Sequence, residues 1–248
     1  MTAAATSVTS KVLAILDAFS PERPELTLSE LAARTGLTLP TLHRRAAELV
    51  EWGALERTES SRYRIGLRLW EVGTLAPRGL GLRERALPFL EDLYVVTRQN
   101  VQLAVREGLE LVFVERIAGR GAVPVLTRVG GRFSLHATGV GLALLAYAPA
   151  DIQEAVITGQ LPAYTSFTIT DGERLRRELA EVRHRGYAVS DRMVTEDALS
   201  VAAPVHGPQG EVVAAVSLVT LAADARPHAL APVVRTAARQ ISRALGAL

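Results

Sequence analysis

The N-terminal part of the chain alternates amphipathic helical patterns with turn residues. Apolar side chains recur at helical spacing over residues 8–19, which predicts a first helix that stops before a proline-rich loop. Residues 27–36 begin with a Thr and Glu in capping-box spacing and end in glycine, which predicts a second helix. A third helix follows Thr38, which can cap it, and the spacing predicts that its buried stripe consists of Leu42, Ala46, Leu49 and Val50.

Two short helices separated by so few residues predict a helix-turn-helix. Two alternating segments on either side of "TESS" then predict a basic β-hairpin. This order of elements is typical of a winged helix-turn-helix, whose second helix reads bases in the major groove and whose wing contacts phosphates. The alternative is an ordinary solvated face with a few surface arginines. The predicted contact residues for double-stranded operator DNA are Thr38, Pro40, Thr41, His43, Arg44, Arg45, Arg57, Arg62 and Arg64.

The rest of the chain mixes helical and strand patterns. A helical stripe over 67–75 leads to a turn-rich stretch at 76–82, and a second helix is expected over 83–97. The later periodicities predict strands at 101–107, 110–117, 123–129, 187–191, 200–206 and 211–221, and helices at 137–147, 170–186 and 227–248. Strands flanked by helices indicate a mixed α/β (α+β) domain.

Composition narrows the chemistry. The chain has 248 residues, 48% of them hydrophobic, which is enough for one large or two ordinary domains. It has no cysteine, so disulfides and thiolate metal sites are excluded. The net charge of +2 permits nucleic-acid binding without requiring it. Residues 1–10 lack a signal-peptide pattern and 212–223 are too short to span a bilayer, so we expect a soluble, cytoplasmic protein without a membrane partner.

Five blocks resemble, in order, the IclR family of bacterial transcriptional regulators: "TLSELAARTGLTLPTLHRRAAELVEWGALER", "YRIGLRLWEVG", "RVGGRFSLHATGVGLALLA", "RGYAVSD" and "VAAPV". The resemblance implies a winged DNA-binding domain over 1–67, a connector helix and linker over 68–82, and a GAF/PAS-like effector-binding and oligomerisation domain over 83–248. It also implies a homodimer or a dimer of dimers. The chain departs from the family pattern at Leu39, Pro40 and Arg45, within the reading helix.

The block "SLHATGVGLALLA" is the candidate effector site. A helix that begins near Thr138 would present free backbone N–H groups, and its glycines would let a ligand approach. The alternative is that the glycines only permit tight packing on the sheet. The resemblance implies an organic or aromatic carboxylate on this turn and a pocket formed by Val125, Phe133, Thr138, Gly139, Val140, Ser190, Ala198 and Ser200, with Arg192 either in the pocket or solvated.

Enzyme functions are the alternative class. The five histidines show no metal-binding spacing, and no nucleotide-binding or hydrolase motif is present, so we expect neither a metal nor a cofactor. His136 could pair with Ser134 as a base and nucleophile, although a structural histidine explains it as well. The sequence therefore favours a ligand-responsive regulator, expected to be a repressor of a catabolic operon, over a catabolic enzyme with a helical N-terminal appendage.

Overall fold

The computed structural model describes residues 7–76, 80–119, 121–223 and 225–247. The chain forms two compact units, Met1–Pro77 and Arg78–Leu248. Helix α4 (Leu67–Gly73) belongs to the first unit, and α5 (Leu80–Thr97) begins the second. The expected turn-rich stretch at 76–82 therefore ends inside a helix, while its residues 77–79 lie outside the described part.

The N-terminal unit is a winged helix-turn-helix, as the sequence predicts. Its helices are α1 (Val8–Asp17), α2 (Leu28–Thr35) and α3 (Leu39–Trp52), and its sheet contains β1 (Glu25–Leu26), β2 (Leu55–Arg57) and β3 (Tyr63–Ile65) in the order β1-β3-β2. Strand β1 was not predicted, because two residues carry no periodicity. The core gathers apolar residues from all three helices and the wing.

The ends of α2 follow the sequence signals. The Thr27 hydroxyl accepts a hydrogen bond from the N–H of Glu30 (3.2 Å), and the N–H of Thr27 donates to the Glu30 carboxylate (2.7 Å). Gly36 ends the helix with a φ of 68°, which favours glycine. Thr38 precedes α3 as expected but does not cap it with its side chain, because its hydroxyl donates to the Thr41 hydroxyl (3.0 Å).

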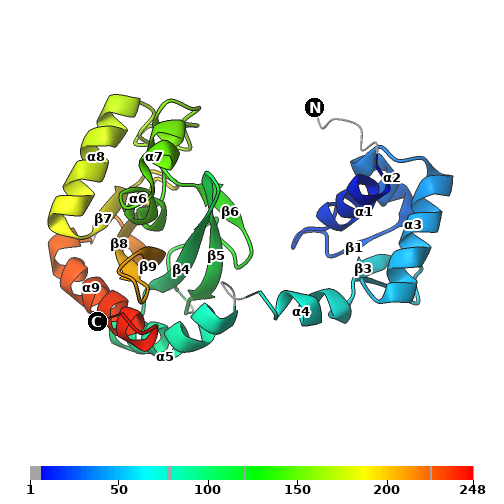
Figure 1. Cartoon of the computed structure of the whole chain (residues 1–248), viewed down its shortest axis with the longest axis horizontal. Coiled ribbons are helices and arrows are strands. Elements are labelled where there is room, and N and C mark those ends of the chain that lie inside the picture. The colour runs from blue at the N-terminus through cyan, green and yellow to red at the C-terminus, as the bar shows by residue number, and fades with distance from the viewer. Residues whose placement is uncertain (1–6, 77–79, 120, 224, 248) are drawn as a thin grey trace. The chain divides into compact units, whose positions relative to one another are not determined.

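The C-terminal unit is built on one six-stranded antiparallel sheet (Figure 1). The strand order is β6-β5-β4-β9-β8-β7. The strands are β4 (Asn100–Glu107), β5 (Glu110–Ile117), β6 (Arg132–Ser134), β7 (Ala188–Asp191), β8 (Ala198–His206) and β9 (Val212–Leu221). The prediction of an α+β effector-type domain is therefore confirmed at the level of its architecture.

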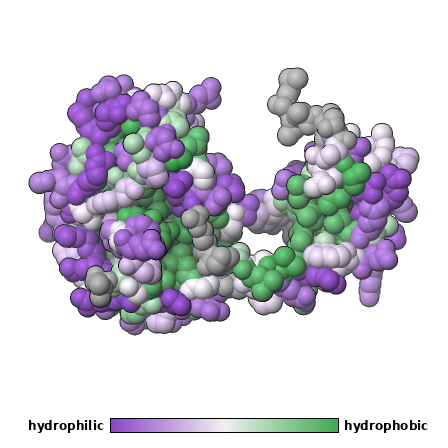
Figure 2. All heavy atoms as spheres, viewed as in Figure 1, coloured by the Kyte–Doolittle hydropathy of each residue, from purple (hydrophilic) through white to green (hydrophobic). Residues whose placement is uncertain are grey.

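Helices cover both faces of this sheet (Figure 1). Helices α5 and α9 (Pro227–Ala244) pack on one face, and α6 (Gly139–Leu145), α7 (Ala150–Ile157) and α8 (Gly172–Arg185) cover the other. Each face has its own apolar core. The charged pattern of α8 faces outward, and Figure 2 shows hydrophilic side chains over it.

One predicted strand is wrong. Residues 123–129 form a loop, and Pro124 within it has no N–H to donate to a sheet. Side chains of the sheet hold this loop instead: Asn100 donates to the carbonyl of Val123 (2.9 Å) and Gln102 donates to the hydroxyl of Thr127 (2.5 Å). Strand β6 and helix α7 were not predicted.

Within the described residues, no helix is long and apolar enough to cross a membrane.

Candidate functional site

The outward face of α3 carries His43 and Arg44, two of the predicted DNA contacts. Leu42 and Ala46 are fully buried, and His43 and Arg44 between them are exposed. Thr38 and Pro40 are also exposed near the helix start, and Thr41 is half-buried. Arg44 has no hydrogen-bond or ion-pair partner among the described residues, so its guanidinium is available to a ligand.

Arg45 lies at the flank of α3 rather than on this exposed face. Its side chain is only 14% exposed, and its guanidinium forms an ion pair with Glu48 on the next turn (2.6 Å). Its Nε is buried without a hydrogen-bond partner in the described structure. A contact between Arg45 and DNA would require this pair to break, which makes it a weaker candidate than Arg44.

The three wing arginines differ in what they contact. Arg57 is exposed and unpaired within the described residues. Arg64 forms an ion pair with Glu56 (2.8 Å) on the neighbouring strand, and this hydrogen bond lowers the pKa of Glu56. Among the described residues Arg57 has no ion-pair partner, so its guanidinium can contact a phosphate without breaking an ion pair.

Arg62, which is predicted to contact phosphates, has partners within the N-terminal unit. Its guanidinium donates to the carbonyl of Glu25 (3.2 Å) and to the carboxylate of Glu30 (2.9 Å). It therefore connects the wing to the capping box of α2. The pKa of Glu30 is lowered, first by the Thr27 N–H and also by Arg62.

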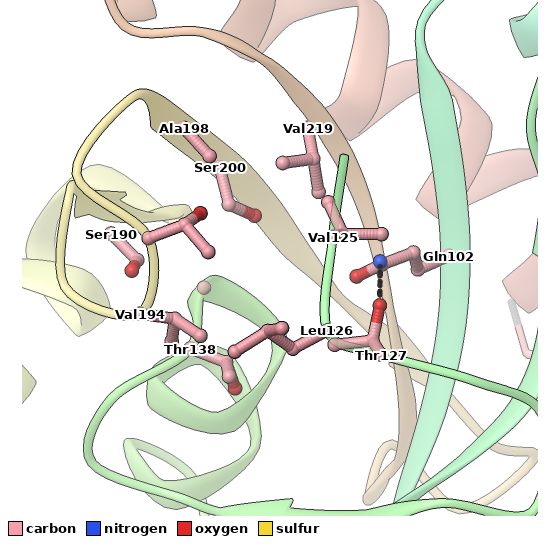
Figure 3. A pocket seen from close by; sticks show the side chains of 12 residues that line it. Gln102, Val125, Leu126, Thr127, Thr138, Ser190, Val194, Ala198, Ser200 and Val219 are labelled. Atoms are coloured by element: carbon pink, nitrogen blue, oxygen red, sulfur yellow. Dashed lines mark hydrogen bonds between the residues drawn. The ribbon is translucent and has the colours of Figure 1, made fainter. Parts of the chain in front are cut away.

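The second candidate site is a small cavity in the C-terminal unit, between the start of α6 and the sheet (Figure 3). Its volume is about 40 Å³, which is enough for water-sized molecules. Six residues of the predicted effector set line it: Val125, Thr138, Gly139, Ser190, Ala198 and Ser200. The sequence reasoning missed six others: Gln102, Leu126, Thr127, Val194, Thr195 and Val219.

Small side chains form the floor of the cavity because α6 begins directly above them. Strand pairing places Ser190 opposite Ser200, and Ser200 opposite Val219. A Cβ at Gly139 would lie 2.6 Å from the Ser200 hydroxyl and 3.3 Å from the Cβ of Ala202. A larger residue at position 139 would therefore crowd Ser200 and Ala202 unless α6 moved away from the sheet.

The first turn of α6 combines tight packing with backbone N–H groups that have no helical partner. Thr138 caps the helix, since its hydroxyl accepts from the N–H of Gly141 (3.0 Å). A side chain at Gly141 would collide with the carbonyl of Leu135. Tight packing therefore accounts for both glycines. The N–H groups of Gly139 and Val140 also have no acceptor within the helix, because they precede the first internal helical hydrogen bond.

Three predicted effector residues do not line the cavity. The ring of Phe133 in β6 packs against Tyr164, with 4.8 Å between ring centroids. The side chain of Val140 is buried in the core under α6. Arg192 pairs with Asp191 (3.0 Å), which raises its pKa, and stacks on Phe167. Phe133 is away from the cavity because β6 lies at the far edge of the sheet. The side chain of Val140 points into the core, and Arg192 comes after the end of β7.

Gln102 is the most informative residue that the sequence reasoning missed. It is only 3% exposed and lines the cavity from β4, in the middle of the sheet. In "VQLAVRE" it is a polar residue on a strand with alternating polarity. Such a residue would ordinarily be expected on the solvent-exposed face of the sheet. Its burial follows from the loop above it, whose Thr127 accepts its hydrogen bond.

His136 is a structural residue in this fold. Its Nε2 donates to the carbonyl of Pro162 (3.0 Å), and burial lowers its pKa. The hydroxyl of Ser134 hydrogen-bonds to Tyr164 instead (2.7 Å), so the two residues do not form a base and nucleophile pair. The described residues also contain no group of three or more side chains that could hold a metal ion.

Comparison with known proteins decides the family. The model of the IclR helix-turn-helix domain matches residues 8–59, and that of the bacterial transcriptional regulator IclR C-terminal domain matches residues 76–243. The chain belongs to the IclR family of bacterial transcriptional regulators. As an IclR-family member it is a DNA-binding regulator with an effector domain, and not a member of an enzyme family.

Individual IclR relatives match along most of the chain. The regulator KipR of Bacillus subtilis is 35% identical over 95% of this chain and 96% of its own length. The repressor AllR of Klebsiella pneumoniae is 30% identical over 74% of this chain and 69% of its own. A crystal structure of an IclR homologue from Microbacterium hydrocarbonoxydans in complex with 4-hydroxybenzoate has a TM-score of 0.92, with 36% identity over 96% of this chain and 99% of that one.

Proposed function

We propose that this IclR-family regulator is a repressor of a catabolic operon and that a small, preferably aromatic, carboxylate controls its affinity for the operator. The cavity at the start of α6 is the observation that carries this proposal. The bound 4-hydroxybenzoate of the Microbacterium homologue and the repressor activity named for AllR support the same assignment.

The lining of the cavity suits a small acid with an apolar body. Val125, Val194 and Val219 provide apolar walls, and Thr138 and Ser200 provide hydroxyl groups beside the first turn of α6 (Figure 3). No charged side chain lines the cavity in the part of the chain that the structure describes. The carboxylate is therefore received by neutral donors: the N–H groups of Gly139 and Val140 and the neighbouring hydroxyls.

An aromatic acid needs more than the present 40 Å³, since small-molecule pockets have volumes on the order of several hundred Å³. The loop at 123–129 is the wall that can move. Leu126 in this loop lines the cavity and is still 68% exposed, so few contacts hold its side chain in place. We propose that binding displaces the loop, at the expense of the hydrogen bonds that Asn100 and Gln102 donate to it.

On DNA, we propose that exposed Arg44 reads base edges in the major groove and that Arg57 contacts a phosphate. A single winged domain makes few contacts, so specific binding needs paired half-sites and paired subunits. Helix α4 offers an apolar surface for that pairing (Figure 2). Its Leu67, Trp70 and Val72 are each at least half exposed.

The experiment is a fluorescence-anisotropy titration of the full chain on DNA from upstream of its own gene and of the genes beside it. Benzoate, 4-hydroxybenzoate and short aliphatic acids are then added. We expect at least one acid to change operator affinity by roughly tenfold or more, within the range of allosteric coupling. If every acid leaves the operator affinity unchanged although specific DNA binding is present, the effector assignment is wrong.

A further inference from the structure

The cavity has hydrogen-bonding groups at two separate ends. One end, beside α6, carries the hydroxyls of Thr138 and Ser200. The other end carries Gln102 and Thr127, and Val125 and Val219 lie between the two (Figure 3). A ligand with a single polar group would leave one of these ends without a partner, and a buried polar group without a partner is costly.

The far end presents an unused acceptor. The amide nitrogen of Gln102 donates to the Thr127 hydroxyl, while its Oε1 has no hydrogen-bond donor among the described residues. Figure 3 shows this oxygen on the side of the amide that is turned toward the cavity. An amide oxygen only accepts hydrogen bonds, so its ligand partner must be a donor.

A second buried group lies beside it. Ser217 in β9 pairs directly with Gln102 in β4, so both side chains are on the same face of the sheet. Ser217 is fully buried, and its hydroxyl has no hydrogen-bond partner in the described part of the chain. Alanine, as at the neighbouring Ala202, would fill this position without the cost of an unpaired hydroxyl.

We propose that Gln102 is a specificity-determining residue and that the effector is a hydroxy-substituted acid, whose hydroxyl donates to Oε1 of Gln102 while its carboxylate lies at the start of α6. This proposal rests on the proposed function. A second carboxylate at the far end is excluded because it has no proton to donate at neutral pH and no cation lines the cavity in the described residues. An ether or a methyl group there would leave Oε1 unpaired.

The test is calorimetric titration of the full-length protein with benzoate, 4-hydroxybenzoate and 4-methoxybenzoate. One additional hydrogen bond predicts that 4-hydroxybenzoate binds about three- to tenfold more tightly than benzoate. 4-Methoxybenzoate, which cannot donate, has no such advantage. In Gln102→Leu the preference for the hydroxyl disappears, whereas in the control Gln240→Leu, an exposed glutamine on α9, it is unchanged.

Each outcome bears on a specific claim. Equal affinities for benzoate and 4-hydroxybenzoate, or a preference that survives in Gln102→Leu, overturn the role of Gln102. If no acid binds the wild type, the proposed function fails as well; if acids bind and alter operator affinity without preferring the hydroxyl, only this inference fails. If Gln102→Leu does not fold, Gln102→Asn takes its place. Its side chain is one methylene shorter, so the amide cannot reach the ligand hydroxyl, and the preference for 4-hydroxybenzoate over benzoate must also disappear.

Discussion

Alanine at position 139 tests how closely α6 must approach the sheet. Its Cβ would lie 2.6 Å from Oγ and 3.2 Å from Cβ of Ser200, and 3.3 Å from Cβ of Ala202. The hydroxyl can rotate away, but the two carbon contacts remain shorter than ordinary van der Waals distances. Overpacking of this kind costs about 1–3 kcal/mol of unfolding free energy. Because the helix must move to relieve it, we also expect weaker acid binding in Gly139→Ala.

The pairwise nature of this contact can be measured. Ser200→Gly removes two of the three close atoms, so it should partly rescue Gly139→Ala. A double-mutant cycle should give a coupling energy of about 0.5–3 kcal/mol, as for residues in direct contact. Gly81→Ala is the matched control, because nothing lies within 4 Å of its added Cβ on helix α5. It should be neutral or stabilising by up to about 1 kcal/mol.

The assay is urea unfolding followed by two signals. Both tryptophans, Trp52 and Trp70, lie in the N-terminal unit, so their fluorescence reports that unit alone. Far-UV circular dichroism also reports the C-terminal unit. We expect Gly139→Ala to lower the midpoint of the second signal and to leave the tryptophan transition unchanged. Unfolding of Gly139→Ala at the wild-type midpoint, or simple additivity with Ser200→Gly, would refute the close-packing argument.

Four further predictions concern other parts of the chain. Arg44→Ala should weaken operator binding by about 1–3 kcal/mol and relax base preference. Arg57→Ala should weaken binding to all DNA equally and reduce by about one the slope of log affinity against log salt concentration, here called the salt slope. Anisotropy titrations at several salt concentrations separate the two. Arg62→Ala should instead lower the urea midpoint of the N-terminal unit with the salt slope unchanged, because Arg62 contacts Glu30. Burial holds the pKa of His136 below its ordinary 6.5, so near and below that pH the unfolded chain binds more protons than the folded one. The free energy of unfolding should therefore fall as the pH drops below 6.5. His136→Gln should make the free energy of unfolding less dependent on pH in unfolding curves measured from pH 7.5 to 5. Trp70→Glu should shift the oligomer toward monomer in sedimentation velocity, since Trp70 is 65% exposed on α4; a wild type that is already monomeric at micromolar concentration contradicts the pairing proposal.

Local signals in the sequence were reliable where one helix turn decides the structure. The capping box of Thr27 and Glu30 and the terminal Gly36 are short-range features, and the structure has them all. Strand alternation was less reliable: residues 123–129 alternate like a strand but form a loop, because hydrogen-bond partners for a strand must come from distant segments. The three residues of β6 are too few for a period to emerge, whereas α7 is as long as α2 but lacks a side-chain cap at its start.

Charge pairing between distant segments could not be predicted from the sequence. Arg62 and Glu30 are far apart in sequence, and only the packing of the wing beside α2 brings their charges to 2.9 Å. Arg44 and Arg45 both have helical spacing to Glu48, yet among the described residues it is Arg45 that pairs with it. The same limit applied to the cavity, where Phe133 matched the expected chemistry but lies on an edge strand.

The anchoring of the 123–129 loop links ligand size to regulation. Asn100 and Gln102 both hold the loop, and Arg116 donates to the carbonyl of Thr127 (3.4 Å) and to Asn100 (3.2 Å). A ligand that fills more than the present cavity must displace the loop, so part of its binding free energy goes into moving it. An effector can regulate only if it binds the DNA-competent and incompetent states with different affinity. Displacement of the loop by a ligand would give such a difference in the C-terminal unit, because the loop in its observed position leaves a cavity of only about 40 Å³.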